Sequence, residues 1–382
     1  MIYLDHAATS PVRREVLEAM WPYLTRDFGN PASHHDVGAA ARHGLEDARR
    51  RVASVLGARP SEVTFCSGGT ESDNTAIKGI ALAEPRGRHV VVSAVEHPAV
   101  LESAAWLGRL GFEVTVLPVD EDGTVQPSTL ASALRVDTTL VSVQYANNEV
   151  GTIQPVAELA AVAAERGVPF HIDAVQAAGW LDLDVRALGV TALSLSGHKL
   201  GTPKGVGVVW VDGRQPWEPL VHGGGQQDGR RSGTEDVASA VGLATALELG
   251  HGDPVAVSQR RDRFVARVLA AGEVALTGHR EHRLPGHASF VFPGRSGESL
   301  LVDLESRGVV CSSGSACAAG SDEPSHVLTA MGLERTLAQS AVRFTFDASL
   351  TEDDLDRAAQ ELTAIRSSGR VGEQTRSSVD VS

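Results

Sequence analysis

The chain has 382 residues, with 34 basic and 48 acidic side chains, so its net charge is 34 − 48 = −14. This charge disfavours direct nucleic acid binding, and no apolar run reaches the roughly 18 residues that a membrane span needs. The first residues lack the basic and apolar regions of a signal peptide, and the three cysteines, Cys66, Cys311 and Cys317, form no CxxC pair. We therefore expect a cytoplasmic protein in a reducing compartment, without a bound metal and without direct membrane or nucleic acid contacts.

Seven short runs rich in Val, Ile and Leu alternate with longer helical patterns in the first two thirds of the chain. The predicted strands are residues 62–65, 89–93, 113–117, 140–145, 169–173, 192–196 and 206–210. The helices predicted between them include residues 70–83, 98–110 and 155–166. Strands that are apolar on both faces and alternate with helices indicate an α/β fold with a doubly wound sheet.

The pattern changes near residue 250, where strands and helices follow in a mixed order. The predicted elements are a helix at 254–271, a strand at 288–292, a helix at 297–307, a Gly/Ser/Cys loop at 311–320, a strand at 341–346 and a helix at 351–367. This order predicts a large domain at 14–250 and a smaller α+β domain made of 1–13 and 251–367. The polar, Ser-rich end at 368–382 is typical of a disordered tail.

Two residues at the ends of predicted strands are candidates for chemistry. Lys199 follows the strand at 192–196, and the only other lysines are Lys78 and Lys204. A lysine at the carboxyl edge of an α/β sheet is either a solvated loop residue or a nucleophile that bonds covalently to a carbonyl group. Asp173 ends the strand at 169–173, where it is either a helix N-cap or the partner of a buried cation, such as the protonated pyridine nitrogen of pyridoxal phosphate.

Three further segments allow both a structural and a functional interpretation. The turn at Gly68 and Gly69 can bind a phosphate at a helix N-terminus, or it can be a plain glycine-rich turn with Thr70 as the helix cap. His97 follows a strand, and it can stack on an aromatic ring or be an ordinary loop histidine. Cys317 lies in a loop of small residues, where it is either an exposed reactive thiol or a buried structural one.

Taken together in chain order, these segments resemble fold-type I pyridoxal phosphate enzymes of the class V aminotransferase group, and more narrowly the NifS/IscS-like cysteine desulfurases. The matching motifs are residues 3–9 (YLDHAAT), 28–34 (FGNPASH), 67–72 (SGGTES), 147–151 (NNEVG), 171–176 (HIDAVQ), 196–199 (SGHK), 223–227 (GGGQQ), 231–234 (RSGT) and 312–317 (SSGSAC). The resemblance covers about residues 1–346. It implies a mainly parallel seven-stranded sheet with helices on both faces, plus a smaller α+β domain.

The resemblance also implies a role for each matching site residue. Lys199 would hold the cofactor covalently, His97 would stack on its ring and assist proton transfer, and Asp173 would pair with the ring nitrogen. The remaining cofactor contacts would come from the Gly69 amide and from Thr70, Asn148, Gln176, Ser196 and His198, with Thr234 contributed by the neighbouring subunit of a homodimer. Asn148 and Arg343 would bind the substrate carboxylate.

By the same resemblance, Cys317 would take the sulfur of L-cysteine as a persulfide, release L-alanine and pass the sulfur to a protein acceptor. The sequence does not identify that acceptor: iron–sulfur cluster assembly, tRNA thiolation, cofactor biosynthesis and DNA sulfur modification all stay open as destinations. Two other functions also stay open, a selenocysteine lyase or C–S lyase on the same scaffold, and a partner-dependent sulfur-transfer scaffold with low activity of its own. The chain departs from the family at Cys66 and Cys311, which we expect to be buried core thiols.

Overall fold

The computed structural model describes residues 1–83, 85–314 and 323–376. The chain forms two compact units. The larger unit comprises Thr9–Asn147 and Ile153–His251, and the smaller comprises Met1–Ala8, Asn148–Thr152 and the chain from Gly252 onward. The segment Asn148–Thr152 thus belongs to the smaller unit, although the sequence predicts an uninterrupted large domain from 14 to 250.

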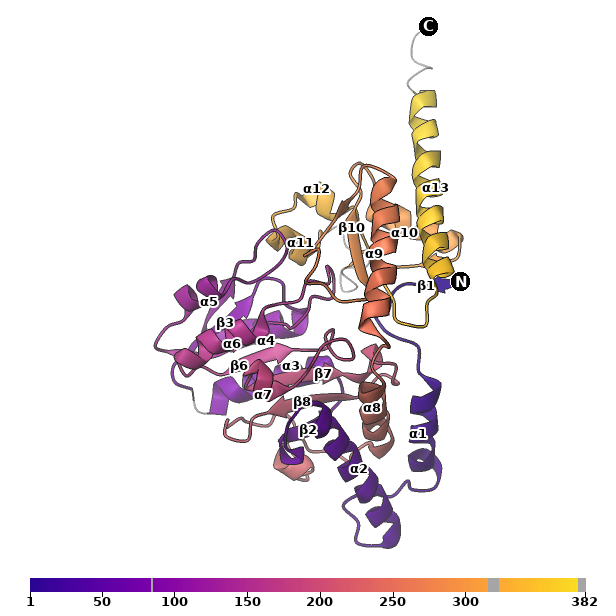
Figure 1. Cartoon of the computed structure of the whole chain (residues 1–382). Helices are drawn as coiled ribbons and strands as arrows, with labels where there is room; N and C mark the ends of the chain where they lie inside the picture. The colour runs from indigo at the N-terminus through magenta and orange to yellow at the C-terminus, as the bar shows by residue number, and fades with distance from the viewer. Residues whose placement is uncertain (84, 315–322, 377–382) are drawn as a thin grey trace. The chain divides into compact units, whose positions relative to one another are not determined.

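A seven-stranded, mainly parallel sheet forms the centre of the larger unit, as the resemblance implied (Figure 1). Its spatial order is β2-β8-β7-β6-β5-β3-β4. The strands are β2 (Val63–Cys66), β3 (His89–Ser93), β4 (Glu113–Leu117), β5 (Thr138–Ser142), β6 (Phe170–Asp173), β7 (Ala192–Ser196) and β8 (Gly207–Val211). Neighbouring strands from β4 to β7 are parallel, whereas β8 is antiparallel to both β7 and β2.

Helices cover this sheet because its strands are apolar on both faces. Every residue of β3, β5, β7 and β8 is buried, which requires a covering layer on each side. Helices α3 (Gly69–Ala83) and α4 (Pro98–Arg109) pack on one face through a core that includes Ile77, Ile80 and Leu107. The remaining helices of this unit are α1 (Arg14–Thr25), α2 (Asp36–Val55), α5 (Pro127–Ala133), α6 (Val156–Glu165), α7 (Val185–Leu188) and α8 (Val237–Leu249).

The smaller unit is built around a three-stranded antiparallel sheet of order β12-β10-β9. Phe264, Phe290 and Phe344 form its aromatic core, with ring centroids 5.3–6.1 Å apart. Strand β1 pairs in parallel with β11. The elements are β1 (Ile2–Tyr3), α9 (Pro254–Ala270), β9 (Ala275–Leu276), β10 (His287–Val291), α10 (Gly297–Ser306), β11 (Val309–Val310), α11 (His326–Ala330), α12 (Arg335–Ala338), β12 (Ala341–Thr345) and α13 (Glu352–Arg376).

Two predicted elements differ from the structure by more than one residue at an end. Strand β5 is Thr138–Ser142 rather than residues 140–145, although the backbone N–H groups of Val143 and Tyr145 still donate to the carbonyls of His171 and Asp173 on β6. Helix α13 continues to Arg376, past residue 367, where the sequence predicts that it ends. In the part of the chain that the structure describes, no helix is long and apolar enough to cross a membrane.

Candidate active site

The backbone of the Lys199 turn is held by the segment that follows the first motif of the chain. Strand β7 ends at Ser196, and Lys199 closes the short 3-10 helix η2 (Gly197–Lys199) directly after it. The backbone N–H of Ser10 donates to the carbonyl of His198 at 3.0 Å, and the Ser10 hydroxyl donates to the carbonyl of Lys199 at 2.9 Å. The Lys199 backbone is therefore fixed at the carboxyl edge of the sheet, where ligands of α/β proteins bind.

His198 is a neutral histidine in this turn. Its Nδ1 lies 3.1 Å from the hydroxyl of Thr9. Burial, with smaller contributions from the charges of Lys199 and Lys204, lowers the His198 pKa to about 4. At neutral pH His198 can therefore donate a hydrogen bond to an anion, but it adds no positive charge.

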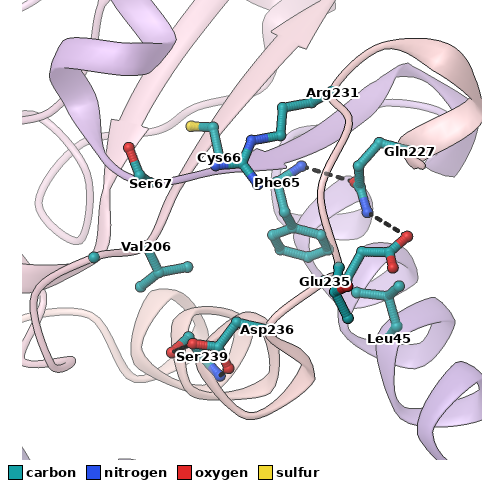
Figure 2. A pocket seen from close by; sticks show the side chains of 12 residues that line it. Leu45, Phe65, Cys66, Ser67, Val206, Gln227, Arg231, Glu235, Asp236 and Ser239 are labelled. Carbon is teal, nitrogen blue, oxygen red and sulfur yellow. Dashed lines mark hydrogen bonds between the residues drawn. The ribbon is translucent and has the colours of Figure 1, made fainter. Parts of the chain in front are cut away.

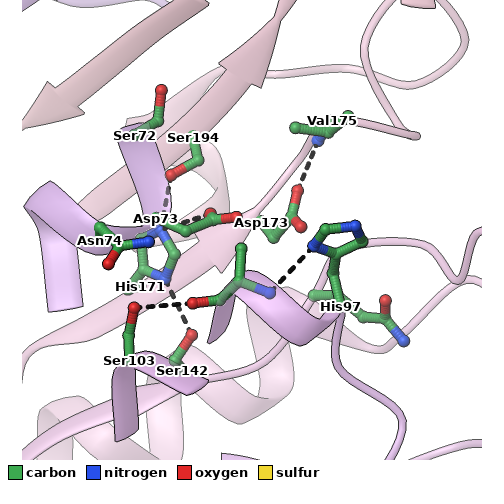
Figure 3. Close-up of polar contacts among 12 residues, drawn as sticks. Ser72, Asp73, Asn74, His97, Ser103, Ser142, His171, Asp173, Val175 and Ser194 are labelled. Carbon is green, nitrogen blue, oxygen red and sulfur yellow. Dashed lines mark hydrogen bonds and ion pairs between the residues drawn. The ribbon is translucent and has the colours of Figure 1, made fainter. Parts of the chain in front are cut away.

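Asp173 is a buried carboxyl group at the end of β6. Its Oδ1 accepts a hydrogen bond from the backbone N–H of Val175 at 2.9 Å (Figure 3). Burial raises the pKa of Asp173, and the charges of His97 and Lys199 partly oppose this shift. Lys199 lies just past β7, the parallel neighbour of β6, and the His97 side chain lies beside Asp173 (Figure 3), so the structure brings together the three residues expected at the reactive end of the cofactor.

The orientation of the His97 ring follows from its position as the N-cap of α4. Its Nδ1 accepts a hydrogen bond from the backbone N–H of Ala99 at 3.1 Å (Figure 3). Because Nδ1 is the acceptor, the neutral ring carries its proton on Nε2. His97 can therefore be both a structural and a functional residue. Its Nδ1 caps α4, and this bond fixes the tautomer of the ring.

A buried polar chain lies beneath Asp173 and crosses three strands. His171 Nδ1 is 2.8 Å from the Ser142 hydroxyl on β5, and His171 Nε2 is 2.9 Å from the Ser194 hydroxyl on β7 (Figure 3). Asp73 Oδ1 of α3 lies 3.8 Å from His171 Nε2, and burial lowers the His171 pKa to about 3. A neutral imidazole donates from one ring nitrogen and accepts at the other, so His171 can donate to one of these two serines and accept from the other.

Three buried carboxyl groups therefore share this region: Asp73, Glu96 and Asp173. Burial raises the pKa of Asp73 well above its usual value, and the charges of Asp173 and Glu96 act in the same direction. Burial also raises the pKa of Glu96 to about 8, although its Oε1 accepts hydrogen bonds from the Ser93 hydroxyl and from the backbone N–H of Gln144. The low local dielectric disfavours three adjacent negative charges.

We expect the Glu96 carboxyl to make the protein less stable as the pH rises. In the unfolded chain it loses its proton near pH 4.5, whereas in the folded chain it keeps it to about pH 8. The free energy of unfolding should thus fall from pH 5 to pH 8 more in the wild type than in Glu96→Gln, by on the order of 1–3 kcal/mol. Urea unfolding at both pH values measures this difference, with the exposed Glu102→Gln as control. Equal pH dependence in the wild type and Glu96→Gln would contradict the burial argument.

The glycine-rich turn between β2 and α3 forms an anion cradle. The backbone of Gly68 has φ +153°. A Cβ on Gly207 would lie 2.6 Å from the Gly68 Cα, so these two backbone segments are too close together for Gly207 to carry a side chain. Helix α3 begins at Gly69, and its first turn presents backbone N–H groups beside exposed Thr70. A Cβ on Gly69 would lie 3.9 Å from the Ser196 hydroxyl. These donors suit a phosphate at the N-terminus of a helix.

The segment 231–234 lies against this cradle (Figure 2). Arg231 Nε bonds to Glu71 Oε1 at 2.9 Å, and Glu71 Oε2 accepts from the backbone N–H of Ser67 at 2.8 Å. A cavity beside them is lined by Arg231, Thr234, Ser67 and Cys66, among others. Thr234 is exposed, and the structure thus places it near the Ser67 turn of its own chain. Gln176 follows β6 and is half-buried.

The residues expected to bind substrate lie in the smaller unit. Arg343 on β12 is 1% exposed, and its Nη1 donates to the carbonyls of Asn148 at 2.8 Å and Gly314 at 2.9 Å. The structure thus brings Asn148 and Arg343 together. Cys317 lies outside the described residues, and of the loop predicted at 311–320 only 311–314 is described.

The other two thiols are held in their protonated form. Cys66 is buried and lies 2.9 Å from the Ser72 hydroxyl, and burial raises its pKa to about 12. Cys311 is half-buried rather than fully buried, so its expected place in the core is only partly correct, yet burial of its thiol also raises its pKa. Neither group supplies a thiolate at neutral pH, and the thiolate is the nucleophilic form of cysteine.

Several residues that contact the predicted site residues within their own unit, or that form the polar chain beneath Asp173, have no role in the sequence analysis. They are Asp5, Thr9, Ser10, Asp73, Ser142, His171 and Ser194. Asp5, Thr9 and His171 lie inside the matching motifs, and Asp73 directly follows one, which is the available signal. Their contacts join segments far apart in the sequence, so the motif alone does not say what they do.

Comparison with known proteins agrees with this geometry. Residues 2–358 match the aminotransferase class-V family. The chain is 48% identical over 375 residues to the "IscS-like cysteine desulfurase" of Mycobacterium tuberculosis, which covers 95% of each protein. It is similar to the solved structure of a "NifS-like protein", with TM-score 0.90 and 36% identity over 96% of this chain and 99% of that one. It is also similar to "SspA in complex with cysteine", with TM-score 0.82 and 36% identity over 91% and 99% of the two chains.

Proposed function

This chain belongs to the aminotransferase class-V family and is a pyridoxal phosphate-dependent cysteine desulfurase, and on that premise we propose that it places the sulfur of L-cysteine on Cys317. The observation that carries the site assignment is the convergence of Lys199, His97 and buried Asp173 at the carboxyl edge of the sheet. In the reaction the Cβ–S bond of L-cysteine breaks and a Cys317 S–S bond forms. The carbon keeps the bonding electrons and takes a proton, which gives L-alanine and a persulfide.

The residues present fit the cofactor. Burial raises the pKa of Asp173, and a protonated ring nitrogen would stabilise its carboxylate form. The Gly69 turn, Thr70, Ser196 and His198 would hold the phosphate, and Gln176 would bind the phenolic oxygen. When bound, the cofactor withdraws electrons from the Cα of the amino acid and so makes its proton acidic.

In this proposal the chain's own side chains move the protons. Lys199 would hold the cofactor covalently and, when its amine is free, would take the Cα proton of the substrate. His97, with its proton on Nε2, would stack on the cofactor ring and would assist proton transfer. Thr234 would complete the phosphate site of the neighbouring subunit, and Asn148 would bind the substrate together with Arg343.

Arg343 would bind the substrate carboxylate because its hydrogen-bonding capacity is not exhausted. Its Nε is buried and has no hydrogen-bond partner among the described residues. A carboxylate accepts two N–H bonds from one edge of a guanidinium. The buried N–H group of Arg343 is therefore a ready-made donor for an anion.

The assignment of sulfur to Cys317 follows from the state of the other thiols. Burial keeps Cys66 and Cys311 protonated, so neither is suited to attack sulfur. After treatment of the holoenzyme with L-cysteine, peptide mass spectrometry should place the added sulfur on Cys317. Sulfur on Cys66 or Cys311 would contradict this assignment.

We expect a homodimer, because an apolar face is uncovered on this chain. Trp21 on α1 is 66% exposed and Phe28 just beyond it is 68% exposed, with exposed Leu17 and Leu24 beside them. A single chain with such a face is typical of a subunit in an assembly.

Sedimentation should give twice the 40.1 kDa chain mass, and Trp21→Glu should shift the protein to the monomer. Val136→Glu, at another exposed apolar residue, is the control; a fully active wild-type monomer would contradict the dimer.

The sulfur on Cys317 would pass to a protein acceptor. A persulfide is a good donor because an acceptor thiolate attacks its outer sulfur and releases the Cys317 thiolate. We propose that this transfer takes place in the cytoplasm. The acceptor's identity does not follow from the residues described.

A further inference from the structure

The N–H groups of Arg343 that have no partner in the described part of the chain determine which further ligand this side chain can bind. A guanidinium has five N–H donors. Two on Nη1 go to the carbonyls of Asn148 and Gly314, and one on Nη2 goes to the Asp5 carboxylate, with Nη2 2.6 Å from Asp5 Oδ1. The Nε–H has no partner among the described residues, and one Nη2 hydrogen also remains. Nε and Nη2 share one edge of the planar group, and two N–H donors are what one further carboxylate requires.

Asp5 is held rigidly at this position by main-chain pairing. It forms a parallel bridge with Thr345, two residues beyond Arg343 on β12. The backbone N–H of Thr345 donates to the carbonyl of Leu4 at 2.8 Å, and the backbone N–H of Ala7 donates to the Thr345 hydroxyl at 2.8 Å. The residues on both sides of Asp5 are thus tied to the same strand that carries Arg343. The Asp5 side chain is 19% exposed, against 1% for Arg343, so the ion pair is largely shielded from water.

This ion pair has two opposing consequences for an anionic ligand. The Asp5 carboxylate adds a contact at Nη2 to the two carbonyl bonds at Nη1, and so helps to keep the Nε edge of the guanidinium in one place. The same carboxylate neutralises the arginine, so a second carboxylate would meet a neutral pair rather than a full positive charge. In a shielded site, the repulsion between two carboxylates on one arginine lowers affinity.

We propose that Asp5 is a positioning residue for Arg343, which orients the guanidinium for the substrate carboxylate and at the same time weakens its hold on that carboxylate. This inference rests on the proposed role of Arg343 in binding the carboxylate. A weakened hold suits a turnover cycle, because the product L-alanine carries the same carboxylate and must leave. The two effects of Asp5 can be separated, since one comes from its oxygen atom as an acceptor and the other from its charge.

Two substitutions should move affinity in opposite directions. Asp5→Asn keeps an oxygen that accepts the Nη2 hydrogen but removes the charge, so the holoenzyme should bind L-alanine about tenfold more tightly. Asp5→Ala removes both the acceptor and the charge, so the guanidinium is held through Nη1 alone, its Nε edge is less well oriented, and L-alanine should bind about tenfold more weakly. The KM for L-cysteine should follow the same order. A purely structural role of Asp5 would weaken binding in both variants.

The measurement is an equilibrium titration of each holoenzyme with L-alanine, followed by the absorbance of the bound cofactor. L-alanine methyl ester, which lacks the carboxylate, should bind all variants alike. Asp347→Asn removes a carboxylate of the same unit that lies 3.8 Å from His6, and it should change affinity less than twofold. Circular dichroism and cofactor content check folding, and Asp5→Asn alone tests the charge effect if Asp5→Ala does not fold.

The possible failures are distinguishable. If the wild type binds the acid and the ester equally and Arg343→Gln changes neither, the proposed role of Arg343 is wrong. If Arg343→Gln weakens binding of the acid alone, while Asp5→Asn fails to tighten it, the role of Arg343 stands and the inference about Asp5 is overturned. Tighter binding in Asp5→Asn with weaker binding in Asp5→Ala supports the inference.

Discussion

Replacing Cys317 with Ser is expected to stop persulfide formation and to lower alanine production by about 10³-fold or more, while the variant still binds cofactor and L-cysteine. A serine hydroxyl stays protonated at neutral pH and is a poor nucleophile toward sulfur, whereas a thiolate is a good one. Binding should survive because Lys199, Asp173 and Arg343 are unchanged. Cofactor absorbance on addition of L-cysteine measures binding, and alanine and sulfide assays measure turnover.

Cys66→Ser and Cys311→Ser are the matched controls for this variant. Both thiols are shielded and have raised pKa values, so each substitution should cost about 1–3 kcal/mol of stability, on the scale of burying a hydroxyl, and leave the chemistry intact. Undiminished alanine production by Cys317→Ser would show that the sulfur-transfer mechanism proposed for this chain is wrong. Loss of the persulfide in Cys66→Ser or Cys311→Ser, with cofactor still bound, would move the sulfur to another thiol.

Replacing Lys199 with Ala is expected to abolish turnover, by about 10⁴-fold or more, because one side chain both holds the cofactor and moves the Cα proton. Borohydride reduction of the wild type followed by peptide mapping should find the cofactor on Lys199. Lys199→Arg should be no better than Lys199→Ala, because a guanidinium stays protonated and cannot form the covalent bond.

The other two lysines provide the control. Lys78 Nζ bonds to Asn74 at 2.6 Å and lies 4.6 Å from the centre of the Trp106 ring, and Lys204 is exposed. Neither follows a strand of the sheet as Lys199 does, so Lys78→Arg and Lys204→Arg should keep full cofactor content. Reduced cofactor found on Lys78 or Lys204 would overturn the assignment of the site.

Local sequence was sufficient for the strands that carry the chemistry. Residues 89–93, 113–117 and 192–196 are β3, β4 and β7 as predicted, because each is a short β-branched or aliphatic run bounded by polar turns. The positions of Asp173 and Lys199 at strand ends followed directly. Since parallel strands end at one edge of a sheet, both were expected to share that edge.

Other elements had no such local signal. Helix α8 (Val237–Leu249) is buried on nearly all sides, so its apolar residues show no helical face that periodicity could detect. Helix α2 (Asp36–Val55) carries many polar residues, and it packs on α8, far along the chain. The tertiary contact, rather than the local pattern, decides where these helices lie.

The sequence by itself determined the fold class and the family, and it predicted which side chains carry the chemistry, because strand periodicity and motif order are local properties of the chain. Only the tertiary structure decided the electrostatic state of those side chains. Asp5 meets Arg343, and His171 joins Ser142 and Ser194, through contacts between residues tens to hundreds of positions apart. Burial and charge depend on what folding brings together in space, so the raised pKa of Asp173 and the shared donors of Arg343 could be read only from the folded chain.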